Sequence, residues 1–151
     1  MLHATLEQDK MVSQDLHRFV SAGMAMEFEY GPHDCAMWPA NWCVLQGRDD
    51  PASRWRGRYD ETGAGELIAK HGLLDLWTLG MIDAQIPEVD EPEIGDVGIV
   101  EVVTHDGTNQ AGAIFTGKRW CCLSQNGVFQ ASMTPLRIWR PRDKIREAVR
   151  G

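Results

Sequence analysis

The spacing of apolar residues divides the chain into a helical first half and a strand-forming second half. Apolar residues recur near every 3.6 positions over residues 9–25, which predicts an amphipathic helix. A second apolar stretch predicts a buried helix over about Cys35–Leu45, which Gly47 would end as a C-terminal cap. A third helix is predicted over about Gly63–Met81, where Gly72 favours a division into two short helices.

After residue 96 the pattern changes to short β-branched and aromatic segments separated by turn residues. It predicts five strands, at Val97–Val103, Ala111–Thr116, Arg119–Ser124, Val128–Ser132 and Pro135–Trp139. The acidic, proline-containing segment 83–96 is expected to be an extended connector, and a short helix is expected over Asp143–Val149. Helices followed by an antiparallel β-meander predict the α+β class. The length of 151 residues indicates one domain, 1–151.

Charge and composition exclude several classes of protein. The formal net charge of −7 argues against binding nucleic acid through its phosphates. No apolar run approaches the roughly 20 residues of a membrane span. The polar segment Met1–Lys10 does not resemble a secretory signal, so we expect folding in a cytoplasm. The four cysteines lack Cys-x-x-Cys spacing, so we expect reduced thiols and neither a zinc site nor a disulfide framework.

One cysteine occupies a position suited to a nucleophile. Cys35 follows a turn at Gly31-Pro32 and the polar residue Asp34, which is a good N-terminal cap for a helix. At the first helical position the helix dipole would favour its thiolate. A buried, inert cysteine is the alternative. Pro39 complicates the interpretation, because either the helix begins nearer Trp38 or its first turn is bent.

Two basic segments are candidate contact surfaces. The segment Arg54–Tyr59 has arginines beside aromatic residues, and the segment Arg137–Arg150 gives an acidic protein a basic end. Trp and Arg are enriched at protein interfaces, so both segments are candidates for docking on a partner. The alternative for each is a solvated segment that needs no partner.

Several short motifs, in order along residues 26–140, resemble one protein family. They are Tyr30-Gly31-x-x-Asp34-Cys35-Ala36, Gly47-x-Asp49-x-Pro51, Arg56-Gly57-x-Tyr59, Gly63-Ala64, Gly95-Asp96-Val97, Ala113-Ile114-Phe115-Thr116-Gly117 and Leu136-Arg137-Ile138-Trp139. In this order they resemble the NlpC-type cell-wall peptidases, and in particular the NlpC-like proteins encoded in phage tail gene clusters. The resemblance implies a papain-like fold, in which a helix that opens on a cysteine is followed by a strand meander.

The same resemblance implies a catalytic cysteine and a histidine base. Cys35 matches the nucleophile that attacks a peptide bond of the peptidoglycan stem. The family histidine would fall at Ala111, beside Gln110, and neither residue can carry a proton at neutral pH. The polar residue that orients this histidine would fall near Leu123 and Ser124, with Gln125 close by. His105, in the loop before the second strand, is the histidine that could serve instead, and a loop histidine with no catalytic role is the alternative.

Two functions therefore follow from the resemblance. In the first, the chain is a phage tail-tip or baseplate cysteine hydrolase that cuts peptidoglycan stem peptides during wall penetration, with Cys35 and His105 as catalytic residues. In the second, it is a catalytically inactive, papain-like structural component of the tail tip or baseplate. Both place it in the virion tail, bound to other tail proteins and made in the host cytoplasm. Neither requires a cofactor or a metal.

Overall fold

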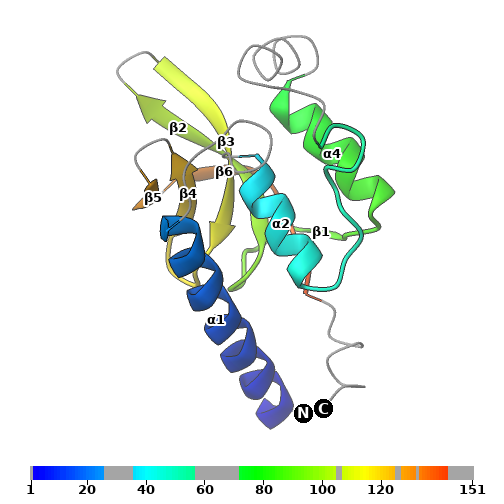
Figure 1. Cartoon of the computed structure of the whole chain (residues 1–151), viewed down its shortest axis with the longest axis vertical. Helices are drawn as coiled ribbons and strands as arrows, with labels where there is room; N and C mark the ends of the chain where they lie inside the picture. The colour runs from blue at the N-terminus through cyan, green and yellow to red at the C-terminus, as the bar shows by residue number, and fades with distance from the viewer. Residues whose placement is uncertain are drawn as a thin grey trace.

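A computed structural model of the chain describes residues 2–25, 36–56, 72–104, 107–124, 127–131 and 133–142. Within these residues the fold is α+β, with three helices and a six-stranded antiparallel sheet (Figure 1). The helices are α1 (Leu2–Ala25), α2 (Met37–Leu45) and α4 (Leu73–Asp83). The strands are β1 (Glu88–Val89), β2 (Val97–Thr104), β3 (Gly107–Phe115), β4 (Trp120–Ser124), β5 (Gly127–Ala131) and β6 (Thr134–Trp139).

The sheet is a meander with one strand inserted. Strands β2 to β5 pair in sequence order, as the sequence predicts, but β6 returns to lie between β1 and β2 in the order β1-β6-β2-β3-β4-β5. Val97 of β2 therefore pairs with both Ile114 of β3 and Trp139 of β6. The segment 83–96 is not wholly an extended connector, because its residues Glu88–Val89 form the edge strand β1.

The two faces of the sheet bury different apolar sets, because successive side chains of a strand point to opposite faces. Cys121 and Cys122 show this alternation, since Cys121 packs in the main core and Cys122 in a smaller cluster on the other face. The main core joins all three helices to the sheet, through residues that include Val12, Leu16, Trp38, Trp42, Trp77, Ile99, Ile114 and Trp139. Five of the six tryptophans, Trp38, Trp42, Trp55, Trp77 and Trp139, thus lie in the core that fixes the helices on the sheet.

Helix α2 begins at Met37, with Ala36 as its N-terminal cap, so the predicted start at Cys35 is two residues early. Pro39 explains the later start. It is the third helical residue, and there its missing N–H removes no intrahelical hydrogen bond. The helix is buried for most of its length, and the Nε1 of Trp42 donates a hydrogen bond of 2.7 Å to the carbonyl oxygen of Gly95. This bond fixes α2 against the loop that precedes β2.

The other helices differ from the prediction in length. Helix α1 is longer than the expected 9–25. Helix α4 begins directly after Gly72, whose φ of 76° is unfavourable for other residues, so a glycine break at this position is confirmed. The expected helical residues before Gly72 and the expected helix Asp143–Val149 lie outside the described residues. No helix in the described part of the chain is long and apolar enough to cross a membrane.

The basic end is partly buried, which corrects the expectation of a free docking surface at Arg140 and Arg142. The guanidinium of Arg140 forms two hydrogen bonds to the Asp96 carboxylate, of 3.1 and 2.9 Å. The Arg142 side chain is 3% exposed, and its Nη1 bonds Asp9 of α1 while its Nη2 lies 3.5 Å from Glu93. These two arginines therefore join the end of β6 to α1 and to the β1–β2 connector.

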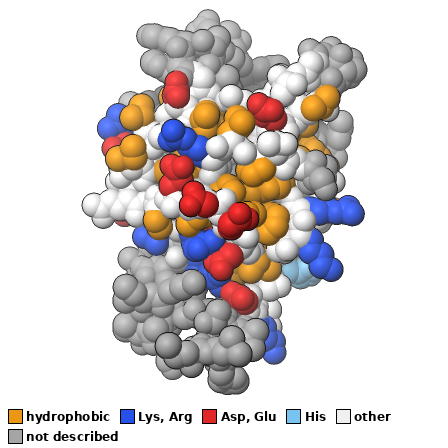
Figure 2. Space-filling view, turned by 180° about the vertical axis from the view of Figure 1, so that it is seen from behind, with side chains coloured by type: hydrophobic (Ala, Val, Ile, Leu, Met, Phe, Trp, Pro, Cys, Tyr) orange, Lys and Arg blue, Asp and Glu red, His pale blue; other side chains and the backbone are white. Residues whose placement is uncertain are grey.

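Figure 2 shows the molecule from behind, where acidic, basic and apolar side chains are interspersed. The exposed acidic residues of the connector include Glu88, Asp90, Glu91 and Glu93. Arg137 lies 3.7 Å from the carboxylate of Glu88, in an exposed pair. Among its described residues, this face shows no continuous basic stripe of the kind that follows a nucleic-acid backbone.

Candidate functional site

Both predicted catalytic residues, Cys35 and His105, lie outside the described residues, but the elements that flank them are described. Ala36, which follows Cys35, is the buried cap of α2. The β2–β3 ladder continues to the pair Thr104–Gly107, so residues 105–106 connect the two strands. In Figure 1 the N-terminal end of α2 points towards the part of the molecule from which the β2–β3 hairpin projects.

The strand register of the β2–β3 hairpin shows how far position 111, expected for the family histidine, lies from the end of the hairpin that carries residue 105. Ala111, at the family position, pairs with Val100. The pair Thr104–Gly107 lies four residues further along β2, which is about 14 Å at roughly 3.4 Å per residue. A histidine between Thr104 and Gly107 is therefore not a one-residue shift from the family position.

Gln110, which lies beside the position expected for the family histidine, makes a hydrogen bond to helix α4. The backbone N–H of Leu74, in the first turn of α4, donates a hydrogen bond of 3.2 Å to Oε1 of Gln110. The first four N–H groups of a helix have no intrahelical acceptor, so Gln110 acts as a cap from the neighbouring strand. Ala111 is half-buried and packs with the smaller cluster on the outer face. In the structure Gln110 accepts a hydrogen bond from α4 and Ala111 packs against an apolar cluster.

The other three cysteines are buried thiols. Desolvation by burial raises the pKa of Cys43 far above its ordinary value, and it raises the pKa of Cys121 from 9.0 to about 11. The sulfur of Cys122 lies 3.8 Å from that of Met133. A thiol with a raised pKa carries almost no thiolate at neutral pH, and only the thiolate is a strong nucleophile. Cys43 and Cys121 are therefore unsuited to nucleophilic catalysis, and Cys122 is buried, with 1% of its surface exposed.

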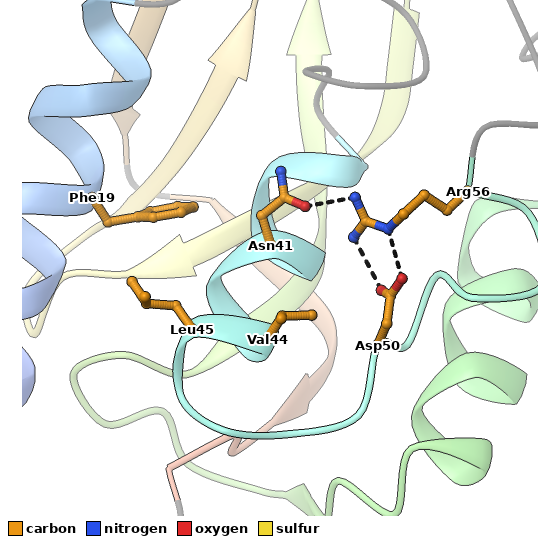
Figure 3. Close-up of a pocket in the computed structure, with 6 residues that line it drawn as sticks. All are labelled: Phe19, Asn41, Val44, Leu45, Asp50 and Arg56. Carbon is orange, nitrogen blue, oxygen red and sulfur yellow. Dashed lines mark hydrogen bonds and ion pairs between the residues drawn. The ribbon is translucent and has the colours of Figure 1, made fainter.

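The structure adds a polar cluster that the sequence did not single out. Nε and Nη2 of Arg56 donate hydrogen bonds of 2.6 and 3.0 Å to the two oxygens of Asp50 (Figure 3). Nη1 of Arg56 donates another, of 2.7 Å, to Oδ1 of Asn41 on α2. The arginine thereby fastens the 47–56 loop to α2. In the sequence, Arg56 could be recognised only as part of a family motif and of a basic loop. The sequence does not show which carboxylate its side chain binds.

Two arginines of the Arg54–Tyr59 segment, a candidate docking surface, bind acidic residues of the same chain. Nε of Arg54 lies 2.6 Å from Oδ2 of Asp83 at the end of α4, and Arg56 is bound to Asp50. Both arginines recognise carboxylates of their own chain. The remaining residues of the segment, 57–59, lie outside the described residues.

Beside the polar cluster lies an open apolar hollow of about 440 Å³. Its walls are Phe19 of α1 and Val44 and Leu45 of α2, and the Arg56–Asp50 pair closes one end (Figure 3). In the described part of the chain, no three His, Cys, Asp or Glu side chains come together in a way that could hold a metal ion.

One comparison with known proteins gives a match. The model of a family described as "Domain of unknown function (DUF6950)" matches residues 8–141. The chain belongs to the DUF6950 family. The match includes α2, α4, all six described strands and the positions of Cys35 and His105. No curated protein and no solved structure matches the chain.

The DUF6950 match ends at residue 141, directly after Arg140 and before Arg142. It therefore contains the whole Arg140–Asp96 pair and the Arg56–Asp50–Asn41 cluster. Both polar clusters of this DUF6950 protein therefore lie within the matched residues.

Proposed function

We propose that this DUF6950 protein is an NlpC-like, papain-fold cysteine hydrolase of a phage tail tip or baseplate. It would act on peptidoglycan stem peptides during wall penetration. The observation that carries the proposal is the placement of α2, which begins two residues after Cys35 and packs on β3 of an antiparallel sheet. A cysteine in front of a buried helix on such a sheet is the arrangement that the sequence resemblance implies.

The proposed reaction is acyl transfer through Cys35. His105 takes the thiol proton, and the Cys35 sulfur attacks the carbonyl carbon of the scissile peptide bond. The resulting tetrahedral intermediate collapses, the C–N bond breaks, and the leaving amine takes the proton from His105. Water then attacks the thioester with His105 again as base, which releases the carboxylic acid and restores the thiol.

The test is hydrolysis of purified muropeptides by the wild type and by Cys35→Ala and His105→Ala. We expect Cys35→Ala to abolish product formation. A positioned base contributes about 100- to 10,000-fold to the rate. His105→Ala should therefore lower the rate of hydrolysis at least about 100-fold, without a change in melting temperature. His17→Ala is the matched control, because His17 is an exposed histidine on α1. Full activity of His105→Ala would exclude His105 as the base.

The second candidate is a catalytically inactive structural component of the tail tip or baseplate. It is favoured by Ala111 at the family histidine position and by Gln110, whose side chain caps α4. Co-expression with neighbouring tail proteins tests it. We expect the wild type and Cys35→Ala to co-purify equally with a tail partner while the wild type forms no muropeptide product. A chain that hydrolyses muropeptides would refute this candidate.

A further inference from the structure

The two edges of the sheet differ in how they are protected against pairing with another strand. Strand β1 forms one edge and β5 forms the other. β1 is only two residues long, Glu88–Val89, and Pro87, Asp90 and Pro92 lie directly around it in the chain. Short length, charge and proline are the features by which proteins keep an edge strand from pairing with another chain. The β1 edge is therefore protected.

The β5 edge lacks these features. Strand β5 (Gly127–Ala131) is longer and contains neither a charged residue nor a proline. In an antiparallel ladder, alternate residues of an edge strand turn their N–H and C=O groups away from the neighbouring strand. β5 pairs with β4 on one side, and no described strand pairs with its other side. Its outward backbone groups can therefore accept another strand.

The distribution of charge in the chain indicates which strand fits this edge. No Asp, Glu, Lys, Arg or His occurs from Trp120 to Leu136, although 25% of the residues of the chain are charged. A net charge as far from zero as −7 keeps copies of a protein apart through mutual repulsion. The uncharged stretch comprises all of β4 and β5, so two copies can approach along β5 without bringing like charges together.

Pairing of two copies at β5 also forms a closed assembly. A two-fold axis at Phe129 sets the two β5 strands antiparallel, with Val128 of each copy opposite Gln130 of the other. The two Phe129 side chains then lie opposite each other, and this aromatic cross-strand pair would cover a side chain that is 37% exposed. The joined sheet ends on both sides in a protected β1 strand, so the assembly stops at two copies.

Helix α1 enlarges the surface that two copies would share. It contacts β5, and Figure 1 shows that its C-terminal end is the part beside that strand. Met24, at this end of α1, is 65% exposed. A two-fold axis perpendicular to the joined sheet keeps both α1 helices on the same face, so their C-terminal ends flank the β5 pair.

We propose that β5 is a dimerisation edge, which pairs antiparallel with β5 of a second copy of this chain and joins the two sheets into one of twelve strands. The proposal goes beyond the proposed function, because it depends on neither Cys35 nor His105 and holds for an active or an inactive chain. It gives Phe129 and Gln130, both exposed in the single chain, a role at the contact between copies.

Sedimentation equilibrium of the full chain over a range of concentrations tests the proposal. We expect a species with twice the 17.0 kDa mass of the chain. Phe129→Lys places two like charges opposite each other at the axis and should raise the dissociation constant at least about tenfold. Gln130→Lys, at an exposed position, should also weaken the dimer and serves if Phe129→Lys alters the fold. Val103→Lys is the control, because Val103 is a strand residue of β2 that is 82% exposed.

Hydrogen exchange provides a readout that requires no substitution. The outward amides of β5 should exchange more slowly as the concentration of the wild type rises, whereas the amides of β1 should not respond. A wild type that stays monomeric at every concentration would overturn the proposal. So would a dimer that Val103→Lys weakens as much as Phe129→Lys does, or a dimer in which the β5 amides gain no protection, because the contact would then lie elsewhere.

Discussion

Replacing Arg140 with alanine should destabilise the fold strongly, because it leaves the carboxylate of Asp96 buried without its cation. Asp96 is 1% exposed, and the only other hydrogen bond that the described residues give its carboxylate comes from the Glu93 N–H, at 2.8 Å. Removing one partner of a buried ion pair costs about 3–5 kcal/mol. For a chain of this length each kcal/mol lowers the melting temperature by about 2–4 °C, so Arg140→Ala should melt roughly 6–20 °C lower.

Arg137→Ala is the matched control for this prediction. Arg137 precedes Arg140 by three residues and also pairs with an acid of the connector, but its side chain is 43% exposed and that of Glu88 is 52% exposed. An exposed pair contributes at most about 1 kcal/mol. Urea and thermal unfolding followed by circular dichroism measure both variants. If Arg140→Ala is no less stable than Arg137→Ala, the buried pair does not stabilise the fold and the argument fails.

The effect of Arg140→Ala should also depend on pH. Burial raises the pKa of the Asp96 carboxyl above its ordinary value of 3.8, against the lowering effect of Arg140 and the Glu93 amide. Without Arg140 that pKa rises further. A group whose folded pKa is raised favours the folded state below its unfolded pKa and loses this contribution as pH increases through the folded pKa. The difference in unfolding free energy between wild type and Arg140→Ala should therefore grow as pH rises through the folded pKa that Asp96 has in the wild type, which lies above 3.8, towards the still higher pKa in the variant. A difference independent of pH would mean that Asp96 is not the group responsible.

Three further predictions concern other parts of the molecule. Gly80→Ala should cost several kcal/mol in unfolding free energy, because its Cβ would lie 2.0 Å from the carbonyl oxygen of Pro51, whereas Leu79→Ala should change stability by less than about 1 kcal/mol. Iodoacetamide at pH 6 should label Cys35 in the native protein and leave Cys43, Cys121 and Cys122 unlabelled until urea is added; mass spectrometry that finds equal native labelling would contradict this. Gln110→Ala should lower stability by about 0.5–2 kcal/mol through loss of the α4 cap, and an unchanged urea midpoint would show that the bond to Leu74 is not stabilising.

The features predicted correctly from the sequence are those with local causes. The strand at Val97–Val103 follows from β-branched residues between turn signals, and the start of α4 follows from Gly72. The place of β6 in the sheet could not be predicted, because its pairing with β2 joins segments more than thirty residues apart. The burial of Arg142 was missed for the same reason, since Asp9 lies 133 residues away along the chain. From sequence alone a charged residue is expected to be exposed to solvent. Its burial can be predicted only when the residue of opposite charge that it pairs with is known. The catalytic roles of Cys35 and His105 stay predictions.

The insertion of β6 between β1 and β2 imposes an order on folding during synthesis. The hairpin β2–β3 and the strands β4 and β5 form from neighbouring segments, but β1 has no partner in the sheet until Thr134–Trp139 have been made. Ribosomes add roughly 5–20 residues per second, so the thirty residues between Thr104 and Thr134 take about 2–6 s. Over that interval one edge of β2 offers unpaired N–H and C=O groups to any passing strand. A chain truncated before Thr134 would lack β6, so one edge of β2 would stay unpaired. It would also lack Arg140, so the Asp96 carboxylate would have no ion-pair partner.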